Sequence, residues 1–248
     1  MIYAVSNQKG GSGKTSASLC LWAGLTHKKG KSLLIDLDAQ SNSSYVAGAK
    51  TDGITILDVL NGTAAATDAI QETIAGDIIP ASPDLADKKK AKDIKPASLW
   101  NALAPIKGMY DYIVLDCPPT LGPMTIAALT AADKVIVVTQ ADIFGLQGLD
   151  QMGQTIEAVK KNANPKLQIE GVLLTRHNSR TNLAQQVTAL ADQLAQKLGT
   201  KLFHSTIRES VIVKESQILQ QDLFTYAPKA KVTQDYASFI SELIEGSI

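Results

Sequence analysis

The sequence predicts an α/β fold in which a doubly wound, mostly parallel β-sheet is flanked by helices. Short runs that are apolar on both faces alternate with longer helical patterns along the whole chain. A sheet buried on both faces requires continuous apolar strands, and the alternation supplies its crossover helices. In addition, a glycine-rich loop, KGGSGKT at residues 9–15, directly follows the first apolar run and opens the first helical segment.

The predicted elements follow one another without long gaps. The strands are mostly β-branched or leucine-rich, and in chain order they are Ile2–Ser6, Ser32–Leu37, Asp77–Ala81, Asp111–Asp116, Lys134–Thr139 and Leu167–Thr175. Between and after them, the predicted helices are Thr15–Lys29, Thr55–Leu60, Ala97–Ile106, Pro123–Ala131, Gly148–Asn162 and Thr181–Leu198. A last short strand is expected at Lys201–Phe203, followed by two helices at Glu209–Gln221 and Thr233–Glu245.

The length of 248 residues suits one domain, and the chain has no internal repeat and no linker rich in Gly, Ser and Pro. We therefore expect a single domain over residues 1–248. Because 24 basic side chains balance 24 acidic ones, a generally basic nucleic-acid coat protein is excluded, whereas a local basic face is not. There is no run of 18 apolar residues and no signal-peptide pattern, so we expect a cytoplasmic protein.

Cysteine and histidine usage argues against a zinc or iron–sulfur site and against an enzyme with a His-based metal site or triad. Cys20 and Cys117 lie far apart and lack the spacing of zinc or iron–sulfur ligands, so we expect two reduced core cysteines. His27, His177 and His204 are scattered along the chain. The one charge run, DLADKKKAKDIK at Asp84–Lys95, predicts a solvated face, with contact to a polyanion as the alternative.

The loop at residues 6–16, SNQKGGSGKTS, predicts a phosphate-binding site. A glycine-rich turn between a strand and a helix lets successive backbone N–H groups point at phosphate oxygens, with the positive end of the helix behind them. Lys14 is placed to reach the β- and γ-phosphates, and the Thr15 hydroxyl to coordinate Mg²⁺. The strict motif GxxxxGK[ST] has a glycine where this chain has Gln8, and the loop contains a second lysine, Lys9, five residues before Lys14.

Two acidic motifs accompany this loop. Asp36 and Asp38 end the second predicted strand, in LIDLD, and Asp116 ends a later one, in YIVLDCPP. Carboxylates at the carboxyl edge of parallel strands lie where open α/β sheets bind ligands, and such a carboxylate holds the Mg²⁺ shell of a nucleotide. We expect Asp36 and Asp38 to have different roles.

With KGGSGKT, DLDAQSN, LDCPPTLG, TRHNSRTNL and TIRESVIVKES in this order, the chain resembles the ParA/MinD group of deviant Walker ATPases. It looks most like the short ParA- or Soj-type partition ATPases, over nearly its whole length. The resemblance implies a P-loop fold, Mg²⁺-dependent hydrolysis of ATP, and a homodimer that forms around two bound nucleotides. It also implies a ParB-like partner that stimulates slow hydrolysis, and nonspecific binding of double-stranded DNA on the nucleoid.

The resemblance also implies roles for single residues. Lys9 matches the lysine that crosses the dimer interface to the partner's phosphates, and Asp38 the carboxylate that orients the attacking water. Asp116 matches the Walker B residue of the outer Mg²⁺ shell, and Asp36 would support Lys14 or the metal waters. The phosphates would be wrapped by Gly10, Gly11, Ser12, Gly13, Lys14, Thr15 and Ser16.

Two arginines match segments that flank the adenine in such proteins, Arg176 and Arg208. For Arg176 a plain surface position is the alternative, and for Arg208 it is contact with DNA. The candidates for DNA contact are Arg208, Lys214, Lys229 and Lys231. The chain departs from the usual pattern at Ala39, where a proline is common, and in Thr206–Arg208, which lacks a proline. Because the first strand begins at Ile2, we do not expect the sequence-specific repressor function of longer plasmid ParA proteins.

Three rival functions remain to be separated. A MinD-like, membrane-associated positioning ATPase would need a basic amphipathic C-terminal helix, but Asp235–Ile248 carries three acidic residues and no Lys or Arg. An iron-protein type of reductase would need a cysteine pair that holds a cluster across a dimer, which Cys20 and Cys117 do not match. An ATP-dependent biosynthetic ligase of the same fold is the third rival, and no substrate motif for it is found.

Overall fold

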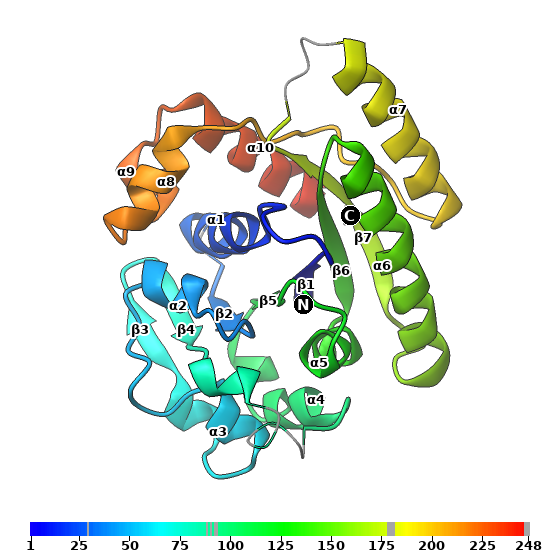
Figure 1. Ribbon diagram of the computed structural model, residues 1–248. Helices are drawn as coiled ribbons and strands as arrows, with labels where there is room; N and C mark the ends of the chain where they lie inside the picture. Colours follow the sequence, from blue (N-terminus) through cyan, green and yellow to red (C-terminus); the bar gives the residue numbers. More distant parts are fainter. Residues whose placement is uncertain (29, 88, 90, 92–93, 178–181, 246–248) are drawn as a thin grey trace.

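The computed structural model describes residues 1–28, 30–87, 89, 91, 94–177 and 182–245. Within these residues, a seven-stranded sheet lies between layers of helices (Figure 1), which confirms the predicted fold class. The strand order is β3-β4-β2-β5-β1-β6-β7. Every neighbouring pair of strands is parallel except β3 and β4, which are antiparallel.

The strands and helices have the following bounds. The strands are β1 (Ile2–Ser6), β2 (Ser32–Asp36), β3 (Gln71–Thr73), β4 (Gly76–Ile79), β5 (Tyr112–Asp116), β6 (Lys134–Gln140) and β7 (Gln168–Thr175). The helices are α1 (Lys14–His27), α2 (Asn42–Val46), α3 (Ile56–Leu60), α4 (Ser98–Leu103), α5 (Pro123–Ala131), α6 (Ile143–Asn162), α7 (Asn182–Lys197), α8 (Val211–Ile218), α9 (Leu223–Tyr226) and α10 (Lys231–Glu245).

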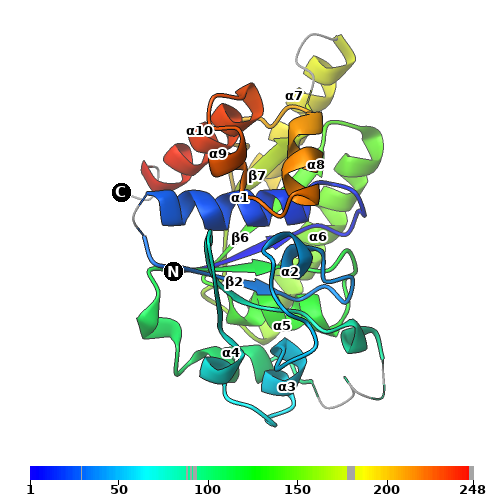
Figure 2. The same ribbon diagram turned by 90° about the vertical axis from the view of Figure 1, so that its left-hand side faces the viewer.

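The helices form two layers, one on each face of the sheet. Helices α1, α8, α9 and α10 cover one face, and α3, α4 and α5 cover the other (Figure 2). Helix α6 packs on α5 and β6, and α7 packs on α6. The central strand β1 leads directly into α1, so the loop between them lies at the carboxyl edge of the sheet, where ligands bind in such folds.

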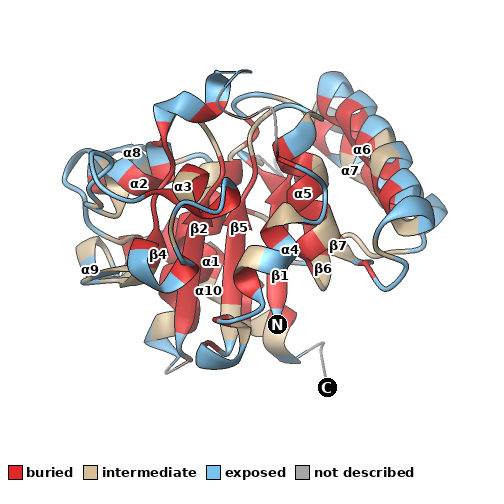
Figure 3. Ribbon diagram, turned by 90° about the horizontal axis from the view of Figure 1, so that it is seen from below, coloured by how far each residue is buried: buried red, intermediate tan, exposed pale blue. Residues whose placement is uncertain are grey.

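The core follows the alternation of the strands. In β1, Ile2 and Ala4 belong to the apolar cluster under α3–α6, whereas Tyr3 and Val5 belong to the cluster under α1 and α10. All five residues of this strand are buried, as are the centres of β2, β5 and β6 (Figure 3). Such burial on both faces explains why continuous apolar runs predicted these strands.

Some predicted boundaries were wrong. Helix α6 begins at Ile143 rather than Gly148, because the Asp142 side chain caps it by accepting a hydrogen bond from the Gly145 N–H (2.7 Å). The expected strand at Lys201–Phe203 is a single bridge between Leu202 and Val172. The sequence did not predict α2, α9 or the short antiparallel edge strand β3, whose residues are partly exposed and polar. Two predicted helix ends, Lys29 and Thr181, lie outside the described residues.

Other predictions from the sequence concern side-chain exposure. Both cysteines are buried, as expected. In the charge run Asp84–Lys95, the described charged residues are exposed, which fits a solvated face, whereas residues 88, 90 and 92–93 lie outside the described part. None of the helices in the described part of the chain combines the length and the hydropathy that a membrane span requires.

Candidate nucleotide site

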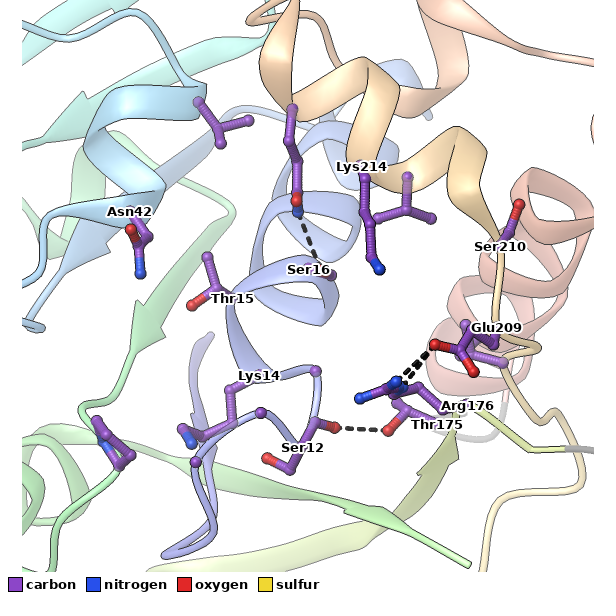
Figure 4. A pocket seen from close by; sticks show the side chains of 18 of the residues that line it. Ser12, Lys14, Thr15, Ser16, Asn42, Thr175, Arg176, Glu209, Ser210 and Lys214 are labelled. Atoms are coloured by element: carbon purple, nitrogen blue, oxygen red, sulfur yellow. Dashed lines mark hydrogen bonds and ion pairs between the residues drawn. The ribbon is translucent and has the colours of Figure 1, made fainter.

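A pocket of about 690 Å³ opens at the carboxyl edge of the sheet. Its floor is the loop between β1 and α1, and its walls come from the segment after β2, the end of β7 and helix α8 (Figure 4). The lining contains seven of the residues predicted to wrap or bind phosphates, from Gly10 to Ser16, and also Asp38, Arg176, Arg208 and Lys214. The fold therefore brings most of the predicted site residues into one cavity.

The backbone of the loop requires its glycines. Gly11 and Gly13 have φ angles of 72° and 88°, in the left-handed region that residues with a side chain rarely adopt. A Cβ at Gly13 would also lie only 3.3 Å from Thr175 Oγ1. Gly13 is the N-cap of α1, so this tight turn aims the amino end of the helix into the pocket.

Neighbouring strand ends hold the loop in place. Thr175, at the end of β7, donates a hydrogen bond to the Ser12 carbonyl (2.6 Å), and Gln140, at the end of β6, donates one to the Gly11 carbonyl (2.7 Å). Within the described part of the chain, the buried Ser12 hydroxyl has no hydrogen-bond partner. An unpaired buried donor on a loop of this kind fits a bound phosphate group.

Lys14 lies at the base of the pocket. The residue is only 6% exposed, and its Nζ donates to the Lys9 carbonyl at 3.1 Å. Burial lowers the pKa of its ammonium, while the charge of Asp116 works in the opposite direction. A buried ammonium is stabilised by an anion, so Lys14 is suited to hold phosphate oxygens.

Asp116 links strand β5 to helices α1 and α2 through hydrogen bonds. It ends β5 and is 1% exposed. Its Oδ1 accepts a hydrogen bond from Ser18 of α1 (2.9 Å), and its Oδ2 accepts one from Ser43 of α2 (2.5 Å). Burial raises the pKa of Asp116, while hydrogen bonds from Ser43, Ser18 and Thr15 lower it. The carboxylate is thereby fixed beside Thr15, the residue predicted to coordinate Mg²⁺.

Asp36 lies beside Asp116 in the sheet, because the two are register partners at the ends of β2 and β5. It is fully buried, and its Oδ2 accepts hydrogen bonds from the backbone N–H and the hydroxyl of Ser44 (2.9 and 2.7 Å). Burial, and then the charge of Asp116, raise the pKa of Asp36 to about 7. Two buried carboxylates side by side favour a cation or a proton in their vicinity.

Asp38 has a different position from Asp36, which is compatible with the different roles expected for the two residues. It lies beyond the end of β2 and lines the pocket, and its Oδ1 accepts a hydrogen bond from the Gln40 N–H (3.0 Å). Its own backbone N–H donates to Asp36 Oδ1 at 3.1 Å. Asp36 therefore positions the backbone that carries Asp38, and it does not itself line the pocket.

Lys9 is not among the residues that line the pocket of its own chain. Its Nζ donates to both oxygens of Asp142 (2.9 and 2.7 Å) and to Gln140 Oε1 (3.3 Å). The ammonium also lies 5.8 Å from the centre of the Phe144 ring. The second lysine of the loop is thus held at the edge of the site by the start of α6.

Comparisons with known proteins agree with this geometry. An AAA domain family model matches residues 1–169. The chromosome partitioning protein ParA of Myxococcus xanthus is 34% identical, over 98% of this chain and 88% of its own. The sporulation initiation inhibitor protein Soj of Bacillus subtilis is also 34% identical, over 98% of this chain and 97% of its own.

The chain belongs to the ParA/MinD family of P-loop ATPases.

A second family model, described as 4Fe-4S iron sulfur cluster binding proteins of the NifH/frxC family, matches residues 109–247. Iron–sulfur binding is part of that family's description, whereas both cysteines of this ATPase are buried in the core. Among solved structures, cobyrinic acid a,c-diamide synthase from Mycobacterium smegmatis, with a bound ATP analogue and magnesium, has a TM-score of 0.85 and 29% identity. The match covers 99% of this chain and 95% of that one.

The residues present fit the ATP and Mg²⁺ that proteins of this family use. Lys14, the backbone of residues 10–16 and the unpaired Ser12 hydroxyl would hold the phosphates, and Thr15 and Asp116 would hold the metal and its waters. The described residues contain no group of three or more His, Cys, Asp or Glu side chains that could hold a metal ion. Mg²⁺ suits such a site because it keeps several waters and binds phosphate oxygens. When bound, Mg²⁺ would neutralise part of the negative charge of the phosphates.

The pocket wall opposite the phosphate loop carries the two arginines that were predicted to flank the adenine. Arg176 has a φ of 51° and forms an ion pair with Glu209, with Nη2 to Oε1 at 2.5 Å (Figure 4). Arg208 forms two side-chain hydrogen bonds with Asp235 of α10, at 2.6 and 2.8 Å. Both guanidinium groups line the pocket, and each has an acidic partner within the chain.

The four candidates for DNA contact fall into two groups. Arg208 and Lys214 line the nucleotide pocket, and Figure 4 shows Lys214 reaching from α8 towards it. Lys229 and Lys231 are exposed, near the start of α10, and are not part of the pocket lining. The first two are therefore also placed to contact a nucleotide.

Sequence reasoning missed the residues that hold the site together. Ser18, Ser43 and Ser44 fix the two buried carboxylates, and Gln140 and Thr175 fix the loop. The only local signal was the polar run SNSS at residues 41–44, directly after the acidic motif. The contacts of Gln140 and Thr175 span 129 and 163 residues, so no local pattern could reveal them.

Proposed function

We propose that this ATPase is a switch for partitioning DNA. The ATP-bound form is a homodimer that binds double-stranded DNA without sequence preference on the nucleoid, in the cytoplasm. A ParB-like protein stimulates its slow hydrolysis, and the cycle moves a plasmid or chromosome. Residues 1–248 act as one domain. The similarity to the chromosome partitioning protein ParA of Myxococcus xanthus supports this proposal.

The position of Lys9 carries the proposal. Lys9 lies outside the pocket of its own chain, and its partly exposed ion pair with Asp142 could be exchanged for contact with a nucleotide bound by a second copy. Ile143 and Phe144, beside it, are 59% and 65% exposed, which suits a surface that a partner covers. Two chains that meet here around two nucleotides would complete each other's sites, so ATP would hold the dimer together and hydrolysis would release it.

The catalytic roles follow from where the charges lie. Phosphoryl transfer depends mainly on positioning and on neutralised charge. Lys14 from one chain and Lys9 from its partner would supply positive charge at the phosphates. Asp38, which lines the pocket, would orient the attacking water.

The main rival is a MinD-like ATPase that associates with a membrane. Residues Tyr236, Phe239, Ile240 and Leu243 form the apolar face of α10, and all four are at most 2% exposed. This face packs in the core and is not free to insert into lipid. The biosynthetic ligase is the other rival, because one of the solved structures that this chain resembles is named as a synthase, cobyrinic acid a,c-diamide synthase from Mycobacterium smegmatis.

Retention of nonspecific duplex DNA tests the proposal. The assay uses the Asp38→Ala protein, which is expected to keep ATP bound. Its retention of DNA is measured with ATP–Mg²⁺ and, separately, with ADP, each at two salt concentrations. We expect retention only with ATP, and retention that weakens steeply with salt, because lysine contacts to phosphates release counterions. Equal retention with ADP, or none with either nucleotide, would contradict it. Anionic liposomes with the same protein test the membrane rival.

The lysines outside the pocket provide the sharper variants. Lys229→Glu with Lys231→Glu should reduce DNA retention at least tenfold and leave ATP affinity unchanged. The matched control is Lys161→Glu with Lys166→Glu, which alters two exposed lysines near the other end of the sheet. Substitutions of Arg208 or Lys214 are less informative, because both residues line the nucleotide pocket.

A further inference from the structure

Helix α8 forms part of the wall of the nucleotide pocket, although little of the helix is buried. The side chains of α8 that line the pocket are Val213, Lys214, Gln217 and Ile218. Of the eight residues of α8, all of which the structure describes, only Ser216 is buried. A helix with so few core contacts needs other contacts to fix its position. Two glutamine side chains at its carboxyl end provide them.

The first of these glutamines, Gln217, bonds to the helix that follows the phosphate loop. Its Nε2 donates a hydrogen bond to the hydroxyl oxygen of Ser16 at 3.0 Å (Figure 4). Ser16 lies in the first turn of α1 and lines the pocket. The amide nitrogen is a donor only, so the Ser16 oxygen accepts here and its own proton is left for another acceptor. The described residues offer this proton no acceptor within hydrogen-bond distance.

A phosphate group is the acceptor that the surroundings of Ser16 favour. The residue directly follows Lys14 and Thr15 at the amino end of α1, where the helix dipole and the free backbone N–H groups attract an anion. A hydroxyl that accepts one hydrogen bond becomes a better donor of its own proton, because successive hydrogen bonds polarise one another. The contact with Gln217 therefore makes Ser16 a stronger and more directed donor.

The second glutamine, Gln220, differs from Gln217 in the group that it contacts. Its Nε2 donates to the backbone carbonyl of Tyr45 in α2 at 2.7 Å, so it also ties the end of α8 to a neighbouring helix. A carbonyl has no proton to redirect, and Gln220 is not among the residues that line the nucleotide pocket. Gln220 is therefore a matched control for Gln217.

We propose that Gln217 is a positioning residue for the nucleotide, because it fixes the hydroxyl of Ser16 as a hydrogen-bond donor to a phosphate group. Helix α8 thereby becomes part of the phosphate site, through a contact between residues 201 positions apart in the chain. The inference rests on the nucleotide pocket and not on DNA partitioning. Its test measures nucleotide affinity alone, so it and the DNA retention assay can fail separately.

The decisive variant is Gln217→Glu, which keeps the size of the side chain but replaces its donor with an acceptor. The carboxylate would accept the Ser16 proton, so the two helices stay tied while the hydroxyl turns away from the phosphate. In isothermal titration with ADP–Mg²⁺, we expect affinity to fall at least about tenfold. Gln220→Glu should change it by less than about twofold. An affinity of Gln217→Glu within twofold of the wild type would overturn the proposal, since Gln217 would then only tie the helices.

A double-mutant cycle separates the effect of the hydroxyl from that of the added charge. Ser16→Ala removes the donor and should itself lower ADP affinity at least about tenfold. In the Ser16→Ala background, Gln217→Glu has no proton to redirect, so its charge alone should cause a further loss of at most about threefold. If the loss in that background equals the loss in the wild type, the charge explains it and the proposal is overturned.

A second variant, Gln217→Leu, tests the contact without any charge. Its side chain neither donates nor accepts, so the Ser16 hydroxyl can still rotate towards the phosphate, although it is no longer held there. We therefore expect Gln217→Leu to lower ADP affinity, but by a smaller factor than Gln217→Glu in the same titration. A larger loss in Gln217→Leu than in Gln217→Glu would overturn the assigned direction of the hydrogen bond and, with it, the positioning role.

Discussion

The two walls of the nucleotide pocket are built in different ways. On the phosphate side, side chains at the ends of β2, β5, β6 and β7, most of them buried, form hydrogen bonds with the loop, with α1 and α2, and with the segment after β2. On the opposite side, two arginines that are 48% and 47% exposed form ion pairs with Glu209 and Asp235. The phosphate wall is thus fixed by the sheet, whereas the arginine wall is held by contacts that solvent reaches.

The difference predicts which substitutions matter. Removing one partner of a buried charge costs about 3–5 kcal/mol, whereas an exposed ion pair contributes about 0–1 kcal/mol. The phosphate wall should therefore respond strongly to single changes, and the arginine wall weakly. Exposed side chains can also leave their partners for a ligand at small cost, so the arginine wall is suited to adjust around a bound nucleotide.

The largest effect is expected for Asp38→Ala. Loss of a group that positions the reacting water should lower the rate of ATP hydrolysis by about 10²–10⁴-fold, while ATP affinity changes little. Phosphate release and nucleotide titration measure the two quantities. Asp52→Ala, which removes an exposed carboxylate of a nearby loop, is the control. Turnover at the wild-type rate would show that Asp38 has no catalytic role.

The second-largest effect is expected for Lys14→Ala, and it is a loss of nucleotide affinity. A charge-assisted hydrogen bond is worth about 1.5–3 kcal/mol, so ADP affinity should fall roughly 10- to 100-fold. Isothermal titration with Lys89→Ala, an exposed lysine, as the control checks this. If ADP affinity fell less in Lys14→Ala than in a variant that lacks the Arg176 side chain, the arginine wall would be the more sensitive of the two walls.

The buried carboxylates should make stability depend on pH. The pKa of Asp36 is raised in the folded state, so between its ordinary value near 4 and about 7 the folded protein holds a proton that the unfolded chain has released. Stability without nucleotide should therefore fall as pH rises through this window and then level off. Urea unfolding at pH 5 and pH 8 measures the fall, and Asp36→Asn should reduce it. If the stability of Asp36→Asn fell between pH 5 and pH 8 by as much as that of the wild type, groups other than Asp36 would cause the pH dependence.

Glu209→Gln should have the smallest effect. It releases Arg176 from an exposed ion pair, so ADP affinity should change by less than about threefold. The same titration measures it. A change of tenfold or more would mean that the arginine wall is as firmly built as the phosphate wall, and the comparison would fail.

Local sequence was sufficient for the phosphate wall because its main groups are contiguous. The loop at 9–15 and the strand-end residues Asp36, Asp38 and Asp116 can each be read from a short apolar run followed by a polar motif. The same continuous apolar runs placed the central strands to within about two residues of their observed ends. The edge strand β3 was not predicted, because a partly exposed polar strand of three residues has no such pattern.

The pairings could not be read from the sequence. The residues predicted to flank the adenine do line the pocket, but their partners Glu209 and Asp235 lie 33 and 27 residues away. Likewise, nothing near Lys9 indicates that it pairs with Asp142, 133 residues further along the chain. Such contacts depend on how the strands are ordered in the sheet, and only the folded chain displays that order.

The pair between Lys9 and Asp142 has a consequence for how the protein responds to ionic strength. Its side chains are 27% and 40% exposed, so salt screens their attraction. In the proposed cycle, salt would weaken the hold of Asp142 on Lys9, but it would equally weaken the attraction of Lys9 to the phosphates of a second chain's nucleotide and the contacts with DNA phosphates. Assembly and DNA loading would then respond to salt in the same direction, and the loaded dimer would be most abundant at low ionic strength.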